Sequence, residues 1–173
     1  AGKTTTVRLI AHLLAGTGAR VGMTNTDGVY VNGHCIDTGD CSGPRSARNV
    51  LAHPDVDAAV LETARGGLLR EGLAFDQCDV AIVTNMGAGD HLGLNYITTL
   101  EDLKVLKRVI VLNVAPTGTA VLNAADPAVV AMAPHCPGSV TFFATAFLAA
   151  GFFAGAFFAA AFLAGAFFAV AMS

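Results

Sequence analysis

Two short stretches decide the fold class of this chain: DAAVLE at residues 57–62 and DVAIVT at residues 79–84. Each is an apolar run of strand length that ends in a polar residue, as expected for a strand buried on both faces of a parallel sheet. Apolar residues recur at helical spacing over residues 4–14 and 99–111. Strands that alternate with helices predict an α/β fold with a doubly wound, mainly parallel sheet and flanking helices.

Shorter stretches predict the remaining elements. Asn32-Gly33 separates two β-prone runs and predicts a hairpin with a type I′ turn. Pro44 predicts the start of a helix. The other predicted strands are residues 21–26, 29–31, 34–36, 119–122 and 140–143, and the other predicted helices are residues 44–53 and 126–132.

Polar residues follow several of the predicted strands. Taken singly, such residues are explained by helix caps and turns. Five strand ends that carry them together instead indicate a ligand site, because ligands of open α/β sheets bind beyond the carboxyl ends of the strands. The residues concerned are Thr24, Asn25, Thr26, Glu62, Thr84, Asn85, His91 and Asn123.

Charge and cysteine usage narrow the classes of function. The 173 residues include 10 Lys and Arg against 13 Asp and Glu, which gives a net charge of -3. The chain therefore has no broad basic field to attract nucleic acid. Its cysteines, at positions 35, 41, 78 and 136, lack the close pairing of a zinc site. We expect no nucleic-acid partner, and reduced thiols in a cytoplasmic protein.

The last part of the chain has a different composition. Residues 142–172 consist almost entirely of Ala, Phe, Gly and Leu, with Phe at every fifth position from 142 to 167. A pentapeptide-repeat β-helix fits poorly, because both members of each apolar pair are large. A membrane helix would lack its usual basic anchors. We favour a low-complexity tail at residues 142–173, non-native or helical, after a domain at residues 1–141, and we expect no membrane partner.

Gly2-Lys3-Thr4 opens the first predicted helix with residues typical of phosphate binding. In a phosphate-binding loop (P-loop), backbone N–H groups and the helix dipole attract phosphate, a lysine adds positive charge and a threonine hydroxyl binds Mg²⁺. Glu62 would supply the carboxylate that holds the metal. Simpler explanations are an ordinary helix start and a solvated carboxylate. The strand that feeds such a loop is expected before residue 1, so we predict a P-loop-type sheet that is truncated.

An ordered set of motifs resembles one family. The motifs are GKTTT at residues 2–6, DGVY at 27–30, GPRSAR at 43–48, ETARGG at 62–67, TN at 84–85, DHLG at 90–93 and VLNA at 121–124. Together they resemble the central ATP-binding domain of the Mur ligase family, over residues 1 to about 140. The resemblance is greatest to members that add arginine to polyaspartate. Folylpolyglutamate synthases, an alternative, do not share the GPRSAR and ETARGG stretches.

The resemblance implies an amide-bond ligase. Such an enzyme uses ATP to convert a carboxylate into an acyl phosphate, which an amine then attacks with release of phosphate. The cofactors implied are ATP and Mg²⁺. For the whole enzyme, the substrates implied are free arginine and an aspartate/arginine polymer that is extended at aspartate side chains. The whole enzyme is expected to be a homo-oligomer.

The resemblance also assigns roles to single residues. Independently of the resemblance, Arg45 and Arg65 stand in glycine-bearing loops next to the expected phosphate end, where their guanidinium groups would bind an anionic polymer substrate or phosphate in two-point contacts. The simpler explanation for both is surface charge. The simpler explanations for His91 and Lys107 are a turn cap and a solvated helix face. The family implies nucleotide contacts for Gly2, Lys3, Thr4, Thr5, Asn123 and Asp126. It implies Mg²⁺ ligation by Thr4, Glu62 and His91. It implies catalytic roles for Lys3, Glu62, His91 and Lys107, and many members carbamylate the lysine at the position of Lys107.

Three departures from the family predict that this fragment is inactive alone. The start of the loop is missing, Ala125 stands where the first of two aspartates is expected, and nothing that resembles the C-terminal domain of the family follows. A rival interpretation is a membrane-anchored P-loop protein without ligase chemistry, in which the tail is functional.

Overall fold

The protein is an α/β sandwich built on one eight-stranded sheet. The structure is a computed structural model that describes residues 2–87, 99–144 and 168–171. The order of strands across the sheet is β3-β2-β1-β4-β8-β5-β6-β7. Its elements are α1 (Lys3–Ala15), β1 (Val21–Asn25), β2 (Gly28–Val31), β3 (His34–Thr38), α2 (Pro44–Leu51), β4 (Ala58–Thr63), α3 (Arg65–Glu71), β5 (Cys78–Val83), α4 (Leu100–Leu112), β6 (Val114–Asn123), α5 (Pro127–Val130), the 3₁₀ turn η1 (Ala133–His135), β7 (Ser139–Phe143) and β8 (Phe168–Ala171).

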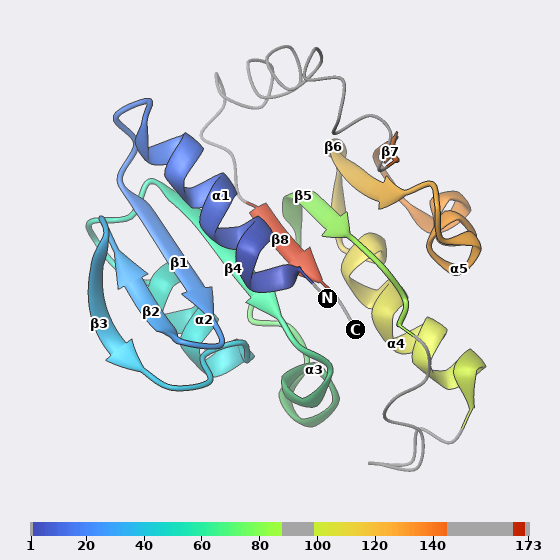
Figure 1. The fold of residues 1–173 in the computed structure, drawn as a ribbon, viewed down its shortest axis with the longest axis horizontal. Helices are drawn as coiled ribbons and strands as arrows, with labels where there is room; N and C mark the ends of the chain where they lie inside the picture. Colours follow the sequence, from blue (N-terminus) through green and yellow to red (C-terminus); the bar gives the residue numbers. More distant parts are fainter. Residues whose placement is uncertain (1, 88–98, 145–167, 172–173) are drawn as a thin grey trace.

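The sheet is parallel except at one edge. Strands β1, β4, β8, β5, β6 and β7 run parallel to one another, whereas β2 pairs antiparallel with β1 on one side and with β3 on the other. Figure 1 shows α1 crossing one face of the sheet, with α2 and α4 on the opposite face. The predicted mainly parallel α/β sheet with flanking helices is thus confirmed.

Alternate residues of the central strands pack on opposite faces, as the pleat of a strand requires. Val60 of β4 joins the cluster under α1, together with Val7 and Ile10. Its neighbours Ala59 and Leu61 join a second cluster, under α2. This two-sided burial explains why β4 reads as a continuous apolar run and not as an alternating one.

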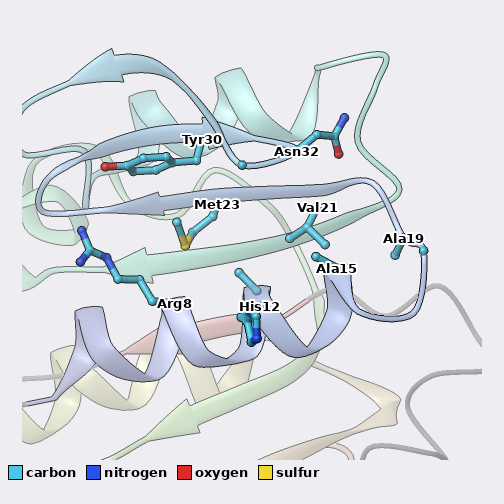
Figure 2. Close-up of a pocket in the computed structure, with 11 residues that line it drawn as sticks. Arg8, His12, Ala15, Ala19, Val21, Met23, Tyr30 and Asn32 are labelled. Carbon is cyan, nitrogen blue, oxygen red and sulfur yellow. The ribbon is translucent and has the colours of Figure 1, made fainter.

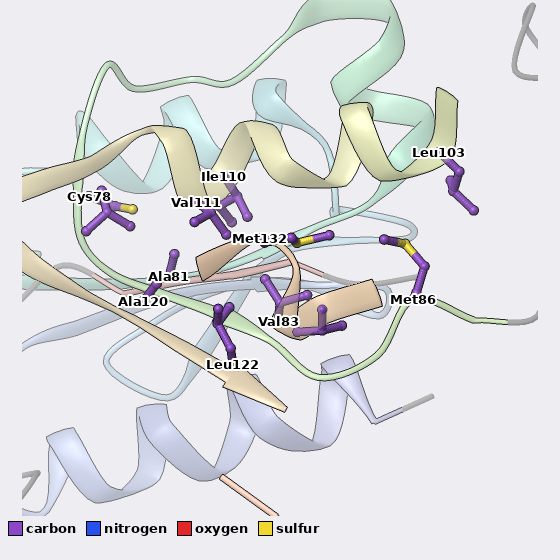
Figure 3. Packing of buried hydrophobic residues seen from close by; sticks show 12 residues of the cluster. Cys78, Ala81, Val83, Met86, Leu103, Ile110, Val111, Ala120, Leu122 and Met132 are labelled. Carbon is purple, nitrogen blue, oxygen red and sulfur yellow. The ribbon is translucent and has the colours of Figure 1, made fainter. Parts of the chain in front are cut away.

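The largest cluster lies between α4 and the strands β5 and β6. Figure 3 shows Ile110 and Val111 of α4 above Ala81 of β5 and Ala120 of β6. The helix is started by a capping box, in which Thr99 Oγ1 accepts from Asp102 N–H (3.1 Å) and Asp102 Oδ2 accepts from Thr99 N–H (3.0 Å). Two reciprocal bonds of this kind satisfy backbone donors that a helix start leaves open.

The hairpin and most other elements match the sequence prediction. Asn32 (φ 50°) and Gly33 (φ 81°) both adopt the left-handed conformation that a type I′ turn needs. The predicted strand at residues 119–122 proves longer, because β6 begins at Val114, which pairs with Cys78. A register shift between Cys78 and Val80 accommodates the irregular start of this pairing.

One strand comes from the apolar tail. β8 pairs in parallel with β4 on one side and with β5 on the other. The backbone groups of residues 168–171 take part in two sheet ladders, and the interpretation of the tail as a non-native or helical segment stays a prediction. Most of the tail, and with it the membrane-helix alternative, lies outside the described residues, and the domain boundary at residue 141 stays a prediction.

Candidate functional site

Three side chains meet where α1 begins and β4 ends. Thr4 Oγ1 donates to Glu62 Oε2 at 2.8 Å, and Lys3 Nζ lies 3.7 Å from Glu62 Oε1. The hydroxyl of Thr26, which follows β1, lies 3.1 Å from Thr4 Oγ1. The fold thus brings together Lys3, Thr4 and Glu62 from distant parts of the sequence, at the carboxyl edge of the sheet.

Glu62 is a buried carboxylate whose two oxygens differ in their hydrogen bonding. The residue is only 2% exposed, and Oε1 accepts no hydrogen bond from the described part of the chain. A buried charged oxygen without a hydrogen bond is costly and points to a ligand that completes it. One carboxylate with two hydroxyl groups beside it is an all-oxygen donor set, which suits Mg²⁺.

The first turn of α1 is open to an anion. Gly2, the N-cap, has φ 99° and ψ 0°, and no side chain caps the helix. The backbone N–H groups of this turn therefore have no side-chain acceptor, and the positive end of the dipole of a 13-residue helix adds to their field. Among the residues that the structure describes, none has an atom within 4 Å of a β-carbon built on Gly2.

Lys107 of α4 is buried, contrary to the solvated-face interpretation. It is 4% exposed, and its Nζ donates to the carbonyl of Met86. Burial lowers the pKa of Lys107 to about 8, with further lowering by the positive charges of Lys3 and Arg65, while Asp126 opposes the change. Three cationic side chains therefore share one region, where an anionic ligand would be stabilised.

Asp126 and Asn123 hold the segment that follows β5. Asp126 Oδ1 accepts from the N–H groups of Ala128 (3.0 Å) and Val129 (3.4 Å) at the start of α5, and its Oδ2 accepts from Met86 N–H at 2.6 Å. Asn123 Nδ2 donates to Thr84 O at 2.7 Å. Both predicted nucleotide-binding residues are thus engaged with backbone groups, which fix the loop that carries the carbonyl accepting from Lys107.

The remaining predicted residues differ in placement. Arg65, half-buried, starts α3, whereas Arg45, at the start of α2, and Thr5, on α1, are exposed. The two helix starts lie close together, since a β-carbon on Gly67 would come within 2.8 Å of Gly43 Cα. His91 lies outside the described residues.

Two contacts of the site were not predicted. Thr26 had a sequence signal, because it is a polar residue at a strand end, but its contact with Thr4 needs the tertiary fold. Met86 contributes two backbone groups: its carbonyl accepts from Lys107 and its N–H donates to Asp126. No side-chain pattern signals a backbone role.

A pocket lies on another part of the surface, away from Glu62. It measures about 530 Å³ and is lined by α1, β1 and the β2–β3 hairpin. Figure 2 shows Arg8 and His12 of α1 on one side of it and Tyr30 on the other. Arg8 is paired with Asp27 at 2.5 Å, so its charge is already neutralised. We assign no ligand to this hollow.

The described residues hold neither a cluster of three or more His, Cys, Asp or Glu suited to a metal nor a helix long and apolar enough to cross a membrane. All four cysteines are free thiols. A metal at the Glu62 edge would therefore depend on hydroxyl groups, on ligand oxygens and on residues beyond the described part.

Comparison with known proteins gives consistent matches. Residues 1–156 match the family described as the Mur ligase middle domain. The cyanophycin synthetases of Synechocystis sp. and of Crocosphaera subtropica are each 54% identical over 142 residues, which cover 82% of this chain and 16% of each relative. A solved structure of UDP-N-acetylmuramoyl-L-alanyl-D-glutamate–2,6-diaminopimelate ligase is similar in fold, with a TM-score of 0.65 at 23% identity, over 83% of this chain and 30% of that one.

Proposed function

Because the chain belongs to the Mur ligase family, we propose that it is the nucleotide-binding part of an ATP-dependent amide ligase of the cyanophycin synthetase type. The observation that carries the proposal is the contact of Lys3 and Thr4 with the buried Glu62. The chain spans about 16% of the length of these relatives, so the reaction belongs to the longer enzyme. We propose that this part alone binds nucleotide but does not form amide bonds.

ATP phosphates bind at the first turn of α1 in this proposal. The uncapped N–H groups and the helix dipole attract them, and Lys3 adds a formal charge. Lys3 now lies beside Glu62, so its ammonium group shifts from a carboxylate to a phosphate when nucleotide enters. Thr5, which is exposed on the same turn, offers a further hydroxyl. Arg65 adds positive charge to the same region.

The donor set fits Mg²⁺. Thr4 and Glu62 would hold one ion, through the hydroxyl and the carboxylate oxygen that lacks a hydrogen bond, and we propose His91 as a ligand of a second ion. Bound Mg²⁺ offsets the negative charge that accumulates on the transferring phosphoryl group. Thr26 orients the Thr4 hydroxyl, and the burial of Glu62 keeps water from its carboxylate.

The acid substrate is an aspartate side chain on a peptide polymer, and the amine is free arginine. In the family reaction, a carboxylate oxygen attacks the γ-phosphorus of ATP, ADP leaves, and the amine then displaces phosphate from the acyl phosphate. Arg65, half-buried next to the phosphate end, binds the reacting carboxylate, and the exposed Arg45 binds neighbouring carboxylates of the polymer.

Lys107 and Asn123 support this chemistry. A Lys107 pKa of about 8 leaves part of the amine neutral near neutral pH, as its proposed carbamylation by carbon dioxide requires. Asn123 and Asp126 hold the segments on which the adenine rests, through their bonds to Thr84 and Met86.

Titration with MgATP tests the proposal. We expect Lys3→Ala to weaken nucleotide binding by about tenfold or more, because a charge-assisted contact is worth roughly 1.5–3 kcal/mol. Glu62→Gln should abolish the dependence on Mg²⁺ while the weaker metal-free binding persists. Lys104→Ala, at a half-buried position of α4 that pairs with Glu101, is the matched control. Unchanged affinity in Lys3→Ala would show that phosphate does not bind at this turn.

A further inference from the structure

The turn between β1 and β2 carries a threonine that contacts the site. β1 ends at Asn25 and β2 begins at Gly28, and these two residues pair with each other, so Thr26 and Asp27 form a two-residue hairpin turn. Thr26 Oγ1 lies 3.1 Å from Thr4 Oγ1, the hydroxyl that donates to the buried carboxylate of the site. The conformation of this turn therefore sets where the Thr26 hydroxyl lies.

The backbone of this turn differs from the one that two-residue hairpins prefer. Such hairpins favour turn types I′ and II′, in which one or both central residues have a positive φ, because these types match the twist of the strands. The β2–β3 turn follows this rule at Asn32 and Gly33, whereas neither Thr26 nor Asp27 adopts a positive φ. The β1–β2 turn therefore needs other contacts to hold it.

Asn25 supplies such contacts from a fully buried side chain. Its Oδ1 accepts from Asp27 N–H at 2.8 Å and from Gly28 N–H at 3.1 Å, and the residue has no solvent exposure. Its Nδ2 makes a weaker contact, to Met23 Sδ at 3.9 Å. Asn side chains that bond to the backbone two residues on stabilise turns in this way. The amide oxygen of Asn25 therefore holds the turn.

Other bonds attach the turn to its surroundings. Asn25 O accepts from Cys41 N–H at 3.0 Å, and Asp27 O accepts from Gly39 N–H at 3.1 Å. Arg8 of α1 pairs with Asp27 at 2.5 Å, but both side chains are more than half exposed, so this ion pair contributes little. The backbone bonds fix the two ends of the turn, and the Asn25 oxygen fixes its conformation.

We propose that Asn25 is a positioning residue for the metal-binding end of the site. By accepting from two amides of the turn, it keeps the Thr26 hydroxyl against Thr4, and Thr4 is thereby aligned with Glu62. This gives a role to a residue that the sequence marks as polar at a strand end. The role toward Mg²⁺ rests on the proposed function, whereas the hold of Asn25 on the turn does not.

Magnesium titration of ATP binding by the full chain separates positioning from stability. Asn25→Leu keeps the volume of the side chain and removes its oxygen, whereas Asn25→Asp keeps an accepting oxygen in the same place. We expect Asn25→Leu to raise the Mg²⁺ concentration that half-saturates ATP binding by about tenfold, as for residues that orient metal ligands. The weaker affinity for ATP without Mg²⁺ should stay unchanged, and Asn25→Asp should restore the Mg²⁺ dependence.

Asn32→Ala is the matched control, because it disturbs the other hairpin turn. Alanine disfavours the φ of 50° at Asn32, so this variant should lose stability in urea without a change in Mg²⁺ dependence. Equal Mg²⁺ dependence in Asn25→Leu and the unaltered chain would overturn the positioning role, and so would an equal shift in Asn32→Ala. If Asn25→Leu does not fold, Asn25→Ser takes its place, because a serine hydroxyl makes the turn contacts more weakly.

Hydrogen exchange keeps a failure of this proposal apart from a failure of the proposed function. The amides of Asp27 and Gly28 should exchange about tenfold faster in Asn25→Leu than in the unaltered chain. Unchanged exchange would show that Asn25 does not hold the turn. An unaltered chain that binds no ATP at any Mg²⁺ concentration would refute the proposed function and the role toward Mg²⁺, and the exchange rates would still decide whether Asn25 holds the turn.

Discussion

The two halves of the sheet use their polar side chains differently. In the first half, on the side of β1 and β4, the site is made of contacts between side chains, with Lys3 and Thr4 against Glu62. In the second half, beyond β5, Lys107 and Asp126 bond to the peptide groups of Met86. In the first half, a ligand could therefore replace one partner of a side-chain contact. In the second half, the charged side chains instead hold a loop in place.

The same halves also differ in how they are joined. Within the described residues, β8 alone connects them through backbone ladders, but the cluster under α1 spans both, since it includes Val60 of β4 and also Val80 and Ile82 of β5. The sheet should therefore unfold as one cooperative unit as long as α1 stays packed.

Removal of core volume in the second half gives the largest expected effect. Ile110→Ala should lower the free energy of unfolding by about 3 kcal/mol, because the side chain of Ile110, on α4, is fully buried. Denaturation in urea measures this loss, with the exposed Val105→Ala on the same helix as control. Hydrogen exchange then tests cooperativity: the slowest amides of β4 and β6 should speed up together, and a change confined to β6 would show that the halves unfold separately.

The buried lysine should make the stability of the protein depend on pH. The unfolded chain holds the Lys107 proton up to its ordinary pKa of 10.5, whereas the folded chain loses it near pH 8. Since the unfolded state binds more protons between these values, the free energy of unfolding should rise with pH across this window, by on the order of 2 kcal/mol. Lys107→Met should remove this contribution to the slope, and Lys104→Met should retain it. Equal slopes in the two variants would contradict the burial of the charge.

Two glycines, one from each half, test how rigid the surroundings are. A β-carbon on Gly118 would lie 2.5 Å from the backbone oxygen of Asp79, whereas one on Gly22 would meet mainly the side chains of Val50 and Val56. Backbone cannot move aside as a side chain can, so Gly118→Ala should cost about 2 kcal/mol and Gly22→Ala about 1 kcal/mol. Urea denaturation of both variants gives the comparison, and the reverse order would place the rigid backbone in the first half.

Thiol reactivity distinguishes the halves without changing stability. Burial raises the pKa of Cys78, at the start of β5, to about 12, with smaller contributions from Asp79 and Cys136. Cys35, in the hairpin of the first half, is exposed. A thiol reagent near neutral pH should therefore label Cys35 quickly and Cys78 only after unfolding. Rapid labelling of Cys78 in native protein would show that the edge of β5 opens readily.

Local sequence patterns predicted most helices and strands, whereas the pairing of distant strands could not be predicted. The Asn32-Gly33 turn and the helix start at Thr99 follow from residues within a few positions of each other, so they could be predicted from the sequence. The position of β8 depends on a free slot in the sheet, which no local pattern encodes.

The candidate site divides in the same way. Lys3, Thr4 and Glu62 could be placed at one edge because parallel strands share a direction. The burial of Lys107 could not be predicted from its own helix, because Lys104, Lys107 and Arg108 read as a charged face and only tertiary packing distinguishes them.

The capping box of α4 also constrains the number of residues between the start of the helix and Lys107. Thr99 and Asp102 fix the residue at which the helix begins, and Lys107 follows Thr99 by eight positions. Each residue of an α-helix advances the side chain by about 100° around the axis. One residue inserted or deleted between the cap and Lys107 would therefore rotate the ammonium group away from Met86, even if every other side chain in the helix were kept. The number of residues in this interval is constrained more tightly than their identity, so related sequences should vary there by substitution and not by insertion or deletion.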